Sequence, residues 1–378
     1  MDQQSRPNLT EQYTQYKHWL FPSPAVVLQL REASMAHAVK AVKAARQANY
    51  GILVAADPST PSQLDSVEFL SASEQADLTL YYEYMIRTLC TRLKLDAVVE
   101  ATAITFFKRF YLLNTVMDYD PKNALITILF LAAKVENSAR PLDKFLAAIP
   151  NAPAAETITA LEFIVCRGLR FHFACQHPYW PLHGYFLDMQ SYHSAKMLST
   201  PAFDSDGNPI SIQDRKRELI VSLWETFQKA REWVRESLLT DLMFWCTPSQ
   251  IAIACWLMAS EHTRRSKDDM AYFVTRFGAR PKLPDAKETP QTPATDGVHK
   301  DKEPLPIDLL MARVTEIKNS LAERKTKTVS REDAATINKK LGLCRNPEFI
   351  IDSPLYKRKR EEEKQEKELK RKLKYERE

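Results

Sequence analysis

The sequence predicts an all-α protein built from two tandem units of five helices each. Only 7 of its 378 residues are glycine, whereas strands and tight loops need glycine wherever the backbone takes a positive φ. Proline begins several apolar runs of helical length, and it is tolerated in the first turn of a helix but not in its interior. One such run, PKNALITILFLAAK from Pro121, is repeated from Pro248 as PSQIAIACWLMASE. This similarity indicates an internal duplication of a helical domain.

The first unit follows an N-terminal helix. Residues 25–48 place apolar side chains at helical spacing on one face, so we expect a helix there that packs against the body of the protein. Pro121, Pro141 and Pro153 mark the starts of later helices. The run Asn123–Ala133 carries no charge, which is typical of a helix buried on all sides. The helices expected in the first unit are residues 73–93, 96–114, 121–138, 141–149 and 153–172.

The second unit repeats this pattern. Its last two helices are separated by residues 278–306, where six prolines interrupt a polar stretch and indicate a linker or an insertion. A short helix over 330–342 follows, and the last twenty residues form a charged helix with Glu and Lys four residues apart. The helices expected in the second unit are residues 178–193, 211–240, 247–261, 266–277 and 306–325.

The chain thus divides into four parts, and its length suits two ordinary domains with tails. We expect an N-terminal segment with its helix over residues 1–65 and a first five-helix unit over 66–177. The second five-helix unit covers 178–328, including the insertion at 278–306. A C-terminal helix and a charged tail occupy 329–378.

Motif content excludes several classes of protein. No GxGxxG or GxxxxGK[ST] loop is present to bind a phosphate. The six cysteines form no CxxC, and the histidines form no HExxH, so we expect reduced thiols with neither metal nor cofactor. Cys175 lies between His172 and His177, which we interpret as a structural helix end and not as a nucleophilic site. Without a run of about 18 apolar residues or a signal peptide, we expect an intracellular, soluble protein.

The positive charge is concentrated in the tail. The net charge is +5, and residues 357–378 contain 11 Lys or Arg against 7 Asp or Glu, which leaves +1 for the remainder. The folded body therefore lacks a basic footprint, and we expect no direct contact with nucleic acid. The run Lys357-Arg358-Lys359-Arg360 matches a nuclear-import signal as well as the start of a solvated charged helix.

A basic pair interrupts an apolar helix in FFKRFYLLNTVMDYDP, residues 106–121. Phe106 and Phe110 belong to the apolar stripe of this helix, and Lys108 lies about half a turn away from it. We therefore expect Lys108 and Arg109 to lie off the core face, with their aliphatic stems covering neighbouring apolar surface.

Two further charges form a candidate site. Lys134 ends the uncharged central helix, where a cation at a helix C-terminus is favourable. Glu162 falls with Ile158 and Val165 on the apolar stripe of the fifth helix, where an unpaired carboxylate costs several kcal/mol. We therefore predict an ion pair at the edge of the core that can present donors and acceptors to a partner's backbone. The second unit has Glu261 in place of Lys134, so the site is expected only once.

The same residues carry a family resemblance. FLAAKVEN (130–137) resembles the third-helix motif of the cyclin box, and ALEFIVCRGLRFHF (160–173) resembles its fifth helix. The chain is thus similar to the cyclins, which contain two five-helix cyclin boxes. Over about residues 16–345 it resembles the cyclin H branch, while the insertion 278–306 and the long tail depart from that pattern. The segments that carry this resemblance are YKHWLFPSPAVVLQLR, FFKRFYLLNTVMDYDP, TDLMFWCTPSQIAIA and KKLGLC.

The resemblance implies a regulatory subunit and not an enzyme. In the family, the third-helix lysine and fifth-helix glutamate contact the backbone around the regulatory C-helix of a kinase; these roles fall on Lys134 and Glu162. Lys108 and Arg109 are further candidates for touching the kinase. The implied partners are a cyclin-dependent kinase catalytic subunit (the CDK-activating kinase), a RING-finger assembly factor and core TFIIH, all in the nucleus. This assembly phosphorylates the RNA polymerase II tail and activates cell-cycle kinases.

Two alternatives remain at this stage. A TFIIB-like, nucleic-acid-binding transcription factor also uses two cyclin-type repeats, but such proteins carry a zinc ribbon and a basic body, which this sequence lacks. Another transcriptional cyclin, such as cyclin C, is the alternative within the family. The N-terminal HWLF segment, from His18, argues against it.

Overall fold

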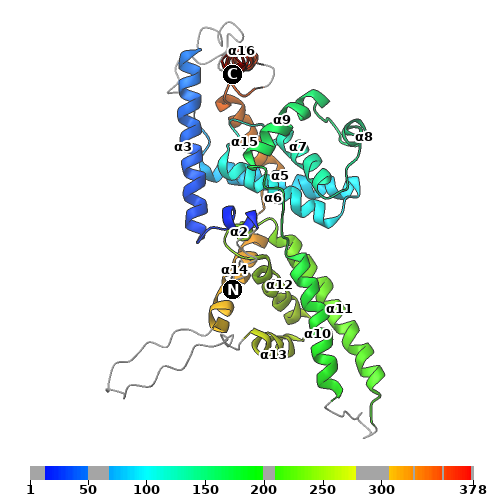
Figure 1. Cartoon of the computed structure of the whole chain (residues 1–378). Helices are drawn as coiled ribbons and strands as arrows, with labels where there is room; N and C mark the ends of the chain where they lie inside the picture. The colour runs from blue at the N-terminus through cyan, green and yellow to red at the C-terminus, as the bar shows by residue number, and fades with distance from the viewer. Residues whose placement is uncertain are drawn as a thin grey trace, which may run out of the picture. The chain divides into compact units, whose positions relative to one another are not determined.

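The computed structural model describes residues 13–49, 68–198, 209–277, 306–326, 328–350 and 353–375, which form helices and the turns between them (Figure 1). The predicted all-α fold class is confirmed. The chain divides into two compact units: Met1–Cys175 with 243–245 and Lys327–Glu378, and Gln176–Leu242 with Cys246–Thr326. Of the expected insertion at 278–306, all but the last residue lies outside the described ranges.

The first unit contains a bundle of five helices around α7. This helix begins at Pro121, where the side chain of Asp120 accepts a hydrogen bond from the backbone N–H of Asn123 over 3.0 Å. Every residue of Ala124–Ala133 is buried, because α5, α6 and α9 pack around α7. The five helices are α5 (Ala72–Leu93), α6 (Ala97–Leu113), α7 (Pro121–Val135), α8 (Leu142–Ala147) and α9 (Ala155–Gly168).

Helices from both ends of the chain complete the first unit. α3 packs on α5 and α6, and α15 packs on α5. The Arg46 guanidinium donates hydrogen bonds to the backbone carbonyls of Leu343 and Arg345, which the C-terminus of α15 would otherwise leave unsatisfied. Lys340 on α15 forms an ion pair with Glu74 on α5 at 2.9 Å. These helices are α2 (Thr14–His18), α3 (Pro24–Ala48), α15 (Arg331–Cys344) and α16 (Pro354–Tyr375).

The second unit is arranged around α12. Thr247 and Gln250 form a capping box at its start, with Pro248 in the first turn. α10, α11, α13 and α14 pack on it. Its helices are α10 (Tyr179–Leu198), α11 (Ile212–Ser237), α12 (Pro248–His262), α13 (Ser266–Phe277) and α14 (Pro306–Thr326). The 3₁₀ turn η2 (Leu242–Phe244) precedes α12 in the chain, and its last two residues are assigned to the first unit.

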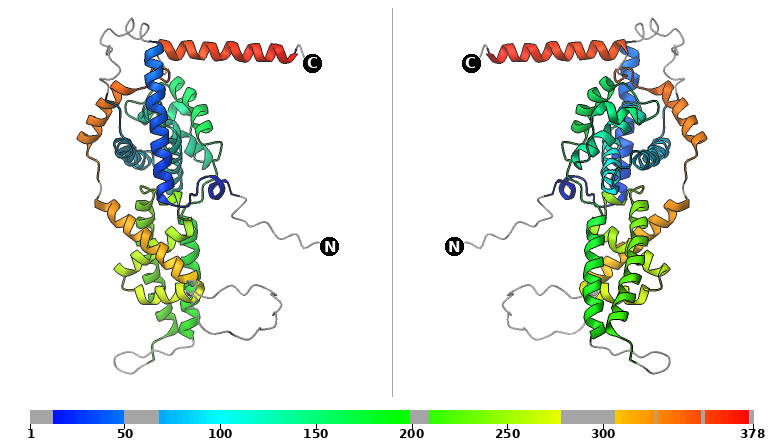
Figure 2. Two further views of the ribbon diagram at one scale, coloured as in Figure 1. Left: turned by 90° about the vertical axis from the view of Figure 1, so that its left-hand side faces the viewer. Right: turned by 90° about the vertical axis from the view of Figure 1, so that its right-hand side faces the viewer.

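α10 and α11 run side by side as a long helical pair (Figure 2). Both views in Figure 2 show the pair extending past α12, α13 and α14 at the end where α10 stops and α11 begins. The other helices of this unit therefore do not cover that end of the pair.

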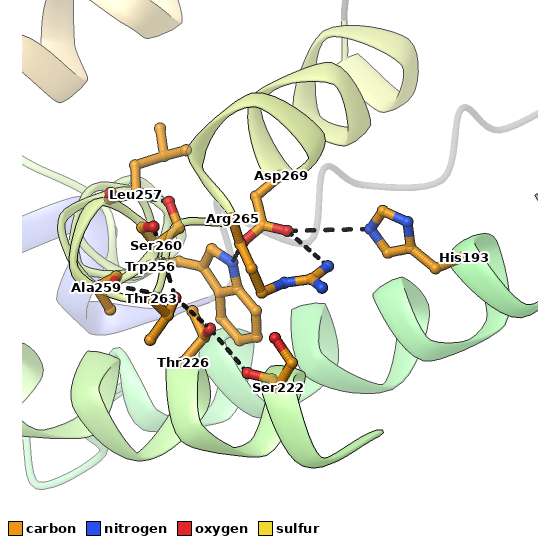
Figure 3. Close-up of polar contacts among 10 residues, drawn as sticks. All are labelled: His193, Ser222, Thr226, Trp256, Leu257, Ala259, Ser260, Thr263, Arg265 and Asp269. Atoms are coloured by element: carbon orange, nitrogen blue, oxygen red, sulfur yellow. Dashed lines mark hydrogen bonds and ion pairs between the residues drawn. The ribbon is translucent and has the colours of Figure 1, made fainter. Parts of the chain in front are cut away.

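A buried carboxylate ties α13 to the rest of the second unit (Figure 3). Asp269 accepts hydrogen bonds from Nε1 of Trp256 at 2.9 Å and from the guanidinium of Arg265 at 3.0 Å. Nε2 of His193 on α10 lies 3.9 Å from the same carboxylate. The hydrogen bonds from Trp256 and Arg265 offset the cost of burying Asp269, whose pKa is raised because burial disfavours its charged form.

Most helix ends lie within two residues of those expected. α10 ends at Leu198 and not at residue 193, α11 ends at Ser237 and not at residue 240, α16 begins at Pro354 and not near residue 359, and α2 was not expected. Two further C-termini also differ. α7 ends at Val135 and not at residue 138, and α9 ends at Gly168 and not at 172. Asn137 has a φ of 55°, and Arg170 and Phe171 have φ values of 55° and 58°. A positive φ lies outside the right-handed helical region, so both helices stop before these residues.

Candidate partner-binding site

Lys134 and Glu162 form an ion pair between α7 and α9. Lys134 lies in the last turn of α7, and its Nζ contacts Oε1 of Glu162. The two side chains are 36% and 26% exposed, so the pair is only partly desolvated. The Lys134 ammonium also lies 4.7 Å from the ring centroid of Phe130, a cation–π contact that further orients it. The predicted ion pair is thus present.

Glu162 lies at the edge of the apolar stripe of α9 and not within it. Ile158, Val165 and Leu169 are completely buried, while Glu162 is half-buried. The expected cost of a carboxylate on this stripe is therefore reduced, because one side of Glu162 faces solvent. Its position lets it accept hydrogen bonds from a molecule placed against the surface.

Burial affects the ionisation of this pair and of its neighbour. Desolvation lowers the pKa of Lys134. Burial raises the pKa of the Cys166 thiol, and the Lys134 charge opposes that rise. Both shifts are the consequence of partial burial at one place, since Cys166 lies one turn after Glu162 on α9. A neutral thiol beside the ion pair adds apolar contact surface to it.

Two exposed aromatic side chains occur on α9, which carries Glu162, and in the turn that ends this helix. Phe163 and Phe171 are 65% and 55% exposed, and their ring centroids are 6.2 Å apart. The positive φ of Phe171 belongs to the turn that ends α9. Exposed aromatic rings next to polar groups are characteristic of protein–protein contact sites. We call Lys134, Glu162, Phe163, Cys166 and Phe171 the α7–α9 face.

The aromatic residues of this face were missed by the sequence analysis. Phe163 follows Glu162 and does not fit the apolar stripe defined by Ile158 and Val165, and this misfit was the available signal. Phe171 was placed inside a helix that ends three residues earlier.

The predicted position of the basic pair on α6 is wrong. Lys108 and Arg109 are both buried, because α6 is covered on nearly all sides and α3 packs on it. Lys108 forms an ion pair with Glu83 at 2.9 Å. Nη1 of Arg109 donates a hydrogen bond to the backbone carbonyl of His172 at 3.3 Å, and its guanidinium lies 5.1 Å from the ring centroid of Trp19. In this structure neither side chain is available for direct contact with a partner.

Arg109 instead helps to anchor the N-terminal segment. Nε1 of Trp19 donates a hydrogen bond to Nδ1 of His172 at 3.1 Å, and His18 stacks on His172 with ring centroids 4.7 Å apart. Burial, followed by the nearby His18 and Arg109, lowers the pKa of His172. A neutral His172 keeps the lone pair on Nδ1 that accepts the hydrogen bond from Trp19. Desolvation raises the pKa of the half-buried Cys175 thiol, and the nearby Arg109 opposes that rise, which fits the structural interpretation of this cluster.

The second unit contains an ion pair of reversed polarity at the corresponding positions. Glu261 ends α12 as Lys134 ends α7, and it pairs with Lys318 on α14. Lys318 precedes the buried Leu321 by three residues, as Glu162 precedes the buried Val165. An ion pair is therefore present at the corresponding positions of both units. Only the first unit has the lysine on its third helix and the glutamate on its fifth helix, as expected.

The basic run at residues 357–360 begins α16 and is partly engaged. Lys359 forms an ion pair with Glu348 at 2.7 Å and lies 4.8 Å from the ring centroid of Phe349. The Arg360 guanidinium lies 5.9 Å from the ring centroid of Tyr356. Lys357 and Arg358 are exposed. The side chains of Lys359 and Arg360 therefore contact other parts of the chain or an aromatic ring, whereas the exposed Arg358 pairs with Glu362 within α16.

Two other kinds of site are absent from the described residues. No helix in these ranges is both long and apolar enough to cross a membrane. Within the same ranges, no group of three His, Cys, Asp or Glu side chains is placed to hold a metal ion.

Comparison with known proteins identifies the two units. A model of the cyclin N-terminal domain matches residues 63–174, and a model of the cyclin C-terminal domain matches residues 177–322, which together are more than half of the chain. The chain belongs to the cyclin family. Among its curated relatives, cyclin CCL1 of Saccharomyces cerevisiae is 32% identical over 56% of this chain and 47% of its own length. A putative cyclin-H of Dictyostelium discoideum is 32% identical over 52% of this cyclin and 62% of the relative.

A third relative matches over a longer range. Cyclin mcs2 of Schizosaccharomyces pombe is 28% identical over 78% of this cyclin and 74% of its own length. The matches to the first two relatives span about half to three fifths of their lengths.

Solved structures share the fold. A chain in the CAK complex of Chaetomium thermophilum bound to ATP-gamma-S superposes with a TM-score of 0.64 at 24% identity, covering 94% of both chains. A chain in the yeast TFIIK (Kin28/Ccl1/Tfb3) complex gives a TM-score of 0.54 at 22% identity, covering 82% of this cyclin and 99% of that chain.

Proposed function

We propose that this cyclin is a non-catalytic regulatory subunit of the cyclin H type that binds and activates a cyclin-dependent kinase. The observation that carries the proposal is the partly exposed Lys134–Glu162 ion pair, whose helix α9 and following turn also carry the exposed rings of Phe163 and Phe171. This combination offers both directional polar groups and apolar contact area.

The ion pair retains hydrogen-bonding capacity for a partner. An ammonium group has three donors, and Glu162 occupies one of those of Lys134. A carboxylate has two acceptor oxygens, and the pair uses Oε1 of Glu162. Lys134 can therefore donate to a backbone carbonyl, while Glu162 accepts from a backbone N–H. Two such bonds, in opposite directions, fix the orientation of a docked backbone segment.

Docking of this kind activates a kinase by placing one of its helices. A kinase needs the glutamate of its C-helix to meet the lysine that binds ATP before it can transfer phosphate. A rigid cyclin surface that holds the C-helix in place favours that arrangement. Phe163 and Phe171 supply apolar contacts at the same surface, and α7 and α9 supply the rigidity.

Lys108 and Arg109 act indirectly in this proposal. Lys108 joins α6 to α5 through Glu83, and Arg109 joins α6 to the N-terminal segment through Trp19. Both contacts stabilise the bundle that carries the α7–α9 face, so these residues position the site without touching the kinase.

The names of relatives and structural neighbours suggest the assembly. The matched structures are described as CAK and TFIIK complexes, and the second contains Kin28, Ccl1 and Tfb3. We propose that this cyclin joins a kinase catalytic subunit, a RING-finger assembly factor and core TFIIH in the nucleus. There it supports phosphorylation of the RNA polymerase II tail and activation of cell-cycle kinases. The cyclin itself needs no cofactor for this role. The match to both cyclin domains favours this function over that of a TFIIB-like factor.

A double substitution tests the kinase-binding role. Lys134→Met/Glu162→Leu removes both charges together, which avoids leaving one charge orphaned and destabilising the fold. We expect a folded protein, by circular dichroism and melting temperature, that fails to pull down or activate the co-expressed kinase.

The second unit supplies a matched control. Glu261→Leu/Lys318→Met removes the ion pair of reversed polarity at the corresponding positions. We expect this variant to bind and activate the kinase normally. Full activation by Lys134→Met/Glu162→Leu would show that the α7–α9 face does not dock the kinase.

A further inference from the structure

One line of exposed positions along α10 carries no charge. Trp180, Gly184, Leu187 and Ser191 recur at helical spacing and are all exposed. Trp180 and Leu187 are large apolar side chains that are 66% and 49% exposed. Surface helices normally direct charged and polar residues to solvent. This line of α10 has the composition of a contact surface and not of a solvated one.

α11 extends the same surface. Ile220 and Trp224 are 47% and 49% exposed. The ring of Trp224 lies 5.7 Å from that of Phe186 on α10, and Phe186 stacks on Phe227 of α11 at 4.9 Å. These contacts join the two helices, so their exposed apolar side chains form one patch. We call Trp180, Gly184, Leu187, Ile220 and Trp224 the α10–α11 face.

Gly184 makes a notch in this face. A Cβ atom placed on it would meet no heavy atom within 4 Å. Glycine inside a helix is unfavourable relative to alanine, and here the fold gives no packing reason for it. What the glycine provides is room between Trp180 and Leu187, which lie four residues before it and three after it. A side chain or helix from another molecule can approach closely at this point.

The charged residues on the side of α11 that carries Ile220 and Trp224 are positive, whereas the exposed Glu218 and Glu225 lie about 100° or more away around the helix. Arg217 lies three residues before Ile220, and Arg231 lies seven residues after Trp224. The Arg231 guanidinium lies 6.0 Å from the ring centroid of Phe227, at the base of the patch. Neither arginine forms an ion pair with any part of the chain that the structure describes. On the side of α11 that carries Ile220 and Trp224, these two charges are therefore not balanced by a carboxylate among the described residues.

We propose that the α10–α11 face binds an acidic amphipathic helix of a partner protein. One apolar side chain of that helix enters the notch over Gly184, and its carboxylates face Arg217 and Arg231. A helix suits this surface because two helices running side by side provide a linear apolar channel, and helices recognise such channels through residues at i, i+3, i+4 and i+7. The arginines select an acidic partner and speed its association. No residue of the α7–α9 face takes part, so this interaction is independent of the proposed kinase contact.

Two model peptides and the full-length cyclin test the proposal. Both are fluorescent helices of about 18 residues, or five turns, with leucine at i, i+4, i+7 and i+11. One carries glutamate at its flanking positions, and its twin carries lysine there. We expect the glutamate peptide to bind in fluorescence anisotropy, and the lysine twin to bind at least about tenfold more weakly at low salt.

A glycine substitution identifies the site of binding. Gly184→Leu fills the notch and favours the helix, so the melting temperature should stay level or rise while affinity for the glutamate peptide falls at least about tenfold. Gly342→Leu is the matched control, because a Cβ at Gly342 on α15 also meets nothing within 4 Å. It should leave peptide binding unchanged. Trp224→Ala should weaken binding as Gly184→Leu does.

Three results would overturn the proposal. In the first, Gly184→Leu retains full affinity for the glutamate peptide. In the second, the lysine twin binds as tightly as the glutamate peptide. In the third, sedimentation velocity of the cyclin alone shows a dimer that Gly184→Leu dissociates, in which case a second copy of this chain occupies the face.

Discussion

Nε1 of Trp19 donates a hydrogen bond to Nδ1 of His172, 3.1 Å away, across 153 residues of sequence. His172 lies directly after the turn that ends α9, so this bond ties the N-terminal segment to the end of the first five-helix bundle. Arg109 contacts both residues and is itself completely buried. The N-terminal segment is thus a structural part of the first unit and leads into α3, which covers α6.

Trp19→Ala should therefore destabilise the protein strongly. Trp19 is fully buried, and truncation of such a side chain to alanine typically costs about 3–5 kcal/mol. The variant also leaves the Arg109 guanidinium without its aromatic partner. Urea unfolding followed by circular dichroism measures the loss. Trp180→Ala, at an exposed tryptophan on α10, should change stability by less than about 0.5 kcal/mol.

Deleting residues 1–50 should have at least the effect of Trp19→Ala, since it also removes α3. A deletion that left the melting temperature and kinase affinity unchanged would show that α3 contributes to neither.

The fold was predictable because its signals are local. Uncharged helices such as Asn123–Ala133 reveal burial through composition alone, and prolines such as Pro121 and Pro248 fix where helices begin. The ends of α7 and α9 were placed too late, since the positive φ values at Asn137 and Phe171 depend on tertiary packing and leave no simple pattern.

The site was predictable only in part. Lys134 was recognisable because it ends an uncharged helix, and Glu162 because it is a charged residue on the apolar stripe of its helix. Lys108 and Arg109 were misplaced because their burial depends on helices distant in sequence: Glu83 lies on α5, and Trp19 precedes α3. Periodicity within α6 describes one face of one helix and cannot show that a second layer covers the other face.

Stability of the second unit should fall at mildly acidic pH. Burial lowers the pKa of His193 from 6.5 to about 4, and the Arg265 charge adds to that effect. The unfolded chain therefore takes up this proton near pH 6.5, whereas the folded chain resists protonation until about pH 4. The free energy of unfolding that depends on a neutral His193 is fully present above pH 6.5. About 3 kcal/mol of it is lost as the pH falls from 6.5 to about 4. Urea unfolding at a series of pH values measures it.

A neutral substitution isolates this contribution. Asp269 has a raised pKa through burial, so its protonation changes stability in the opposite direction, and Asp268 and Lys196 also act on His193. His193→Gln removes only the imidazole titration. We expect the stability of the variant to depend less on pH between about 6.5 and 4 than that of the unmodified protein; equal slopes would contradict the role given to His193.

Gly168→Ala should destabilise the first unit although alanine favours helices. A Cβ at Gly168, the last residue of α9, would lie 2.7 Å from Cδ2 and 2.8 Å from Cε2 of Phe110 on α6. The ring is completely packed and cannot move freely, so overpacking should cost about 1–3 kcal/mol. Gly342→Ala, on an open surface of α15, should instead stabilise the protein by up to about 1 kcal/mol. Thermal unfolding should therefore give a lower melting temperature for Gly168→Ala and a higher one for Gly342→Ala than for the unmodified protein.

The C-terminal tail should be dispensable for kinase activation, but its first turns contribute to stability. Leu355 is buried and Lys359 pairs with Glu348, so α16 is attached to the first unit at its start. Removing residues 361–378 should change stability by less than about 0.5 kcal/mol. Truncation after Asp352 also removes Leu355 and should cost about 1.5–3 kcal/mol.

Kinase activation should survive both truncations, because neither removes Lys134, Glu162 or the helices that carry them. An in vitro kinase assay with purified complexes measures activation, and calorimetry measures stability. Nuclear import is a separate property of the basic run, and substituting the exposed Lys357 and Arg358 by alanine tests it in cells without disturbing the Lys359–Glu348 pair. Loss of kinase activation on removal of 361–378 alone, with stability unchanged, would mean that the distal part of α16 contacts the kinase.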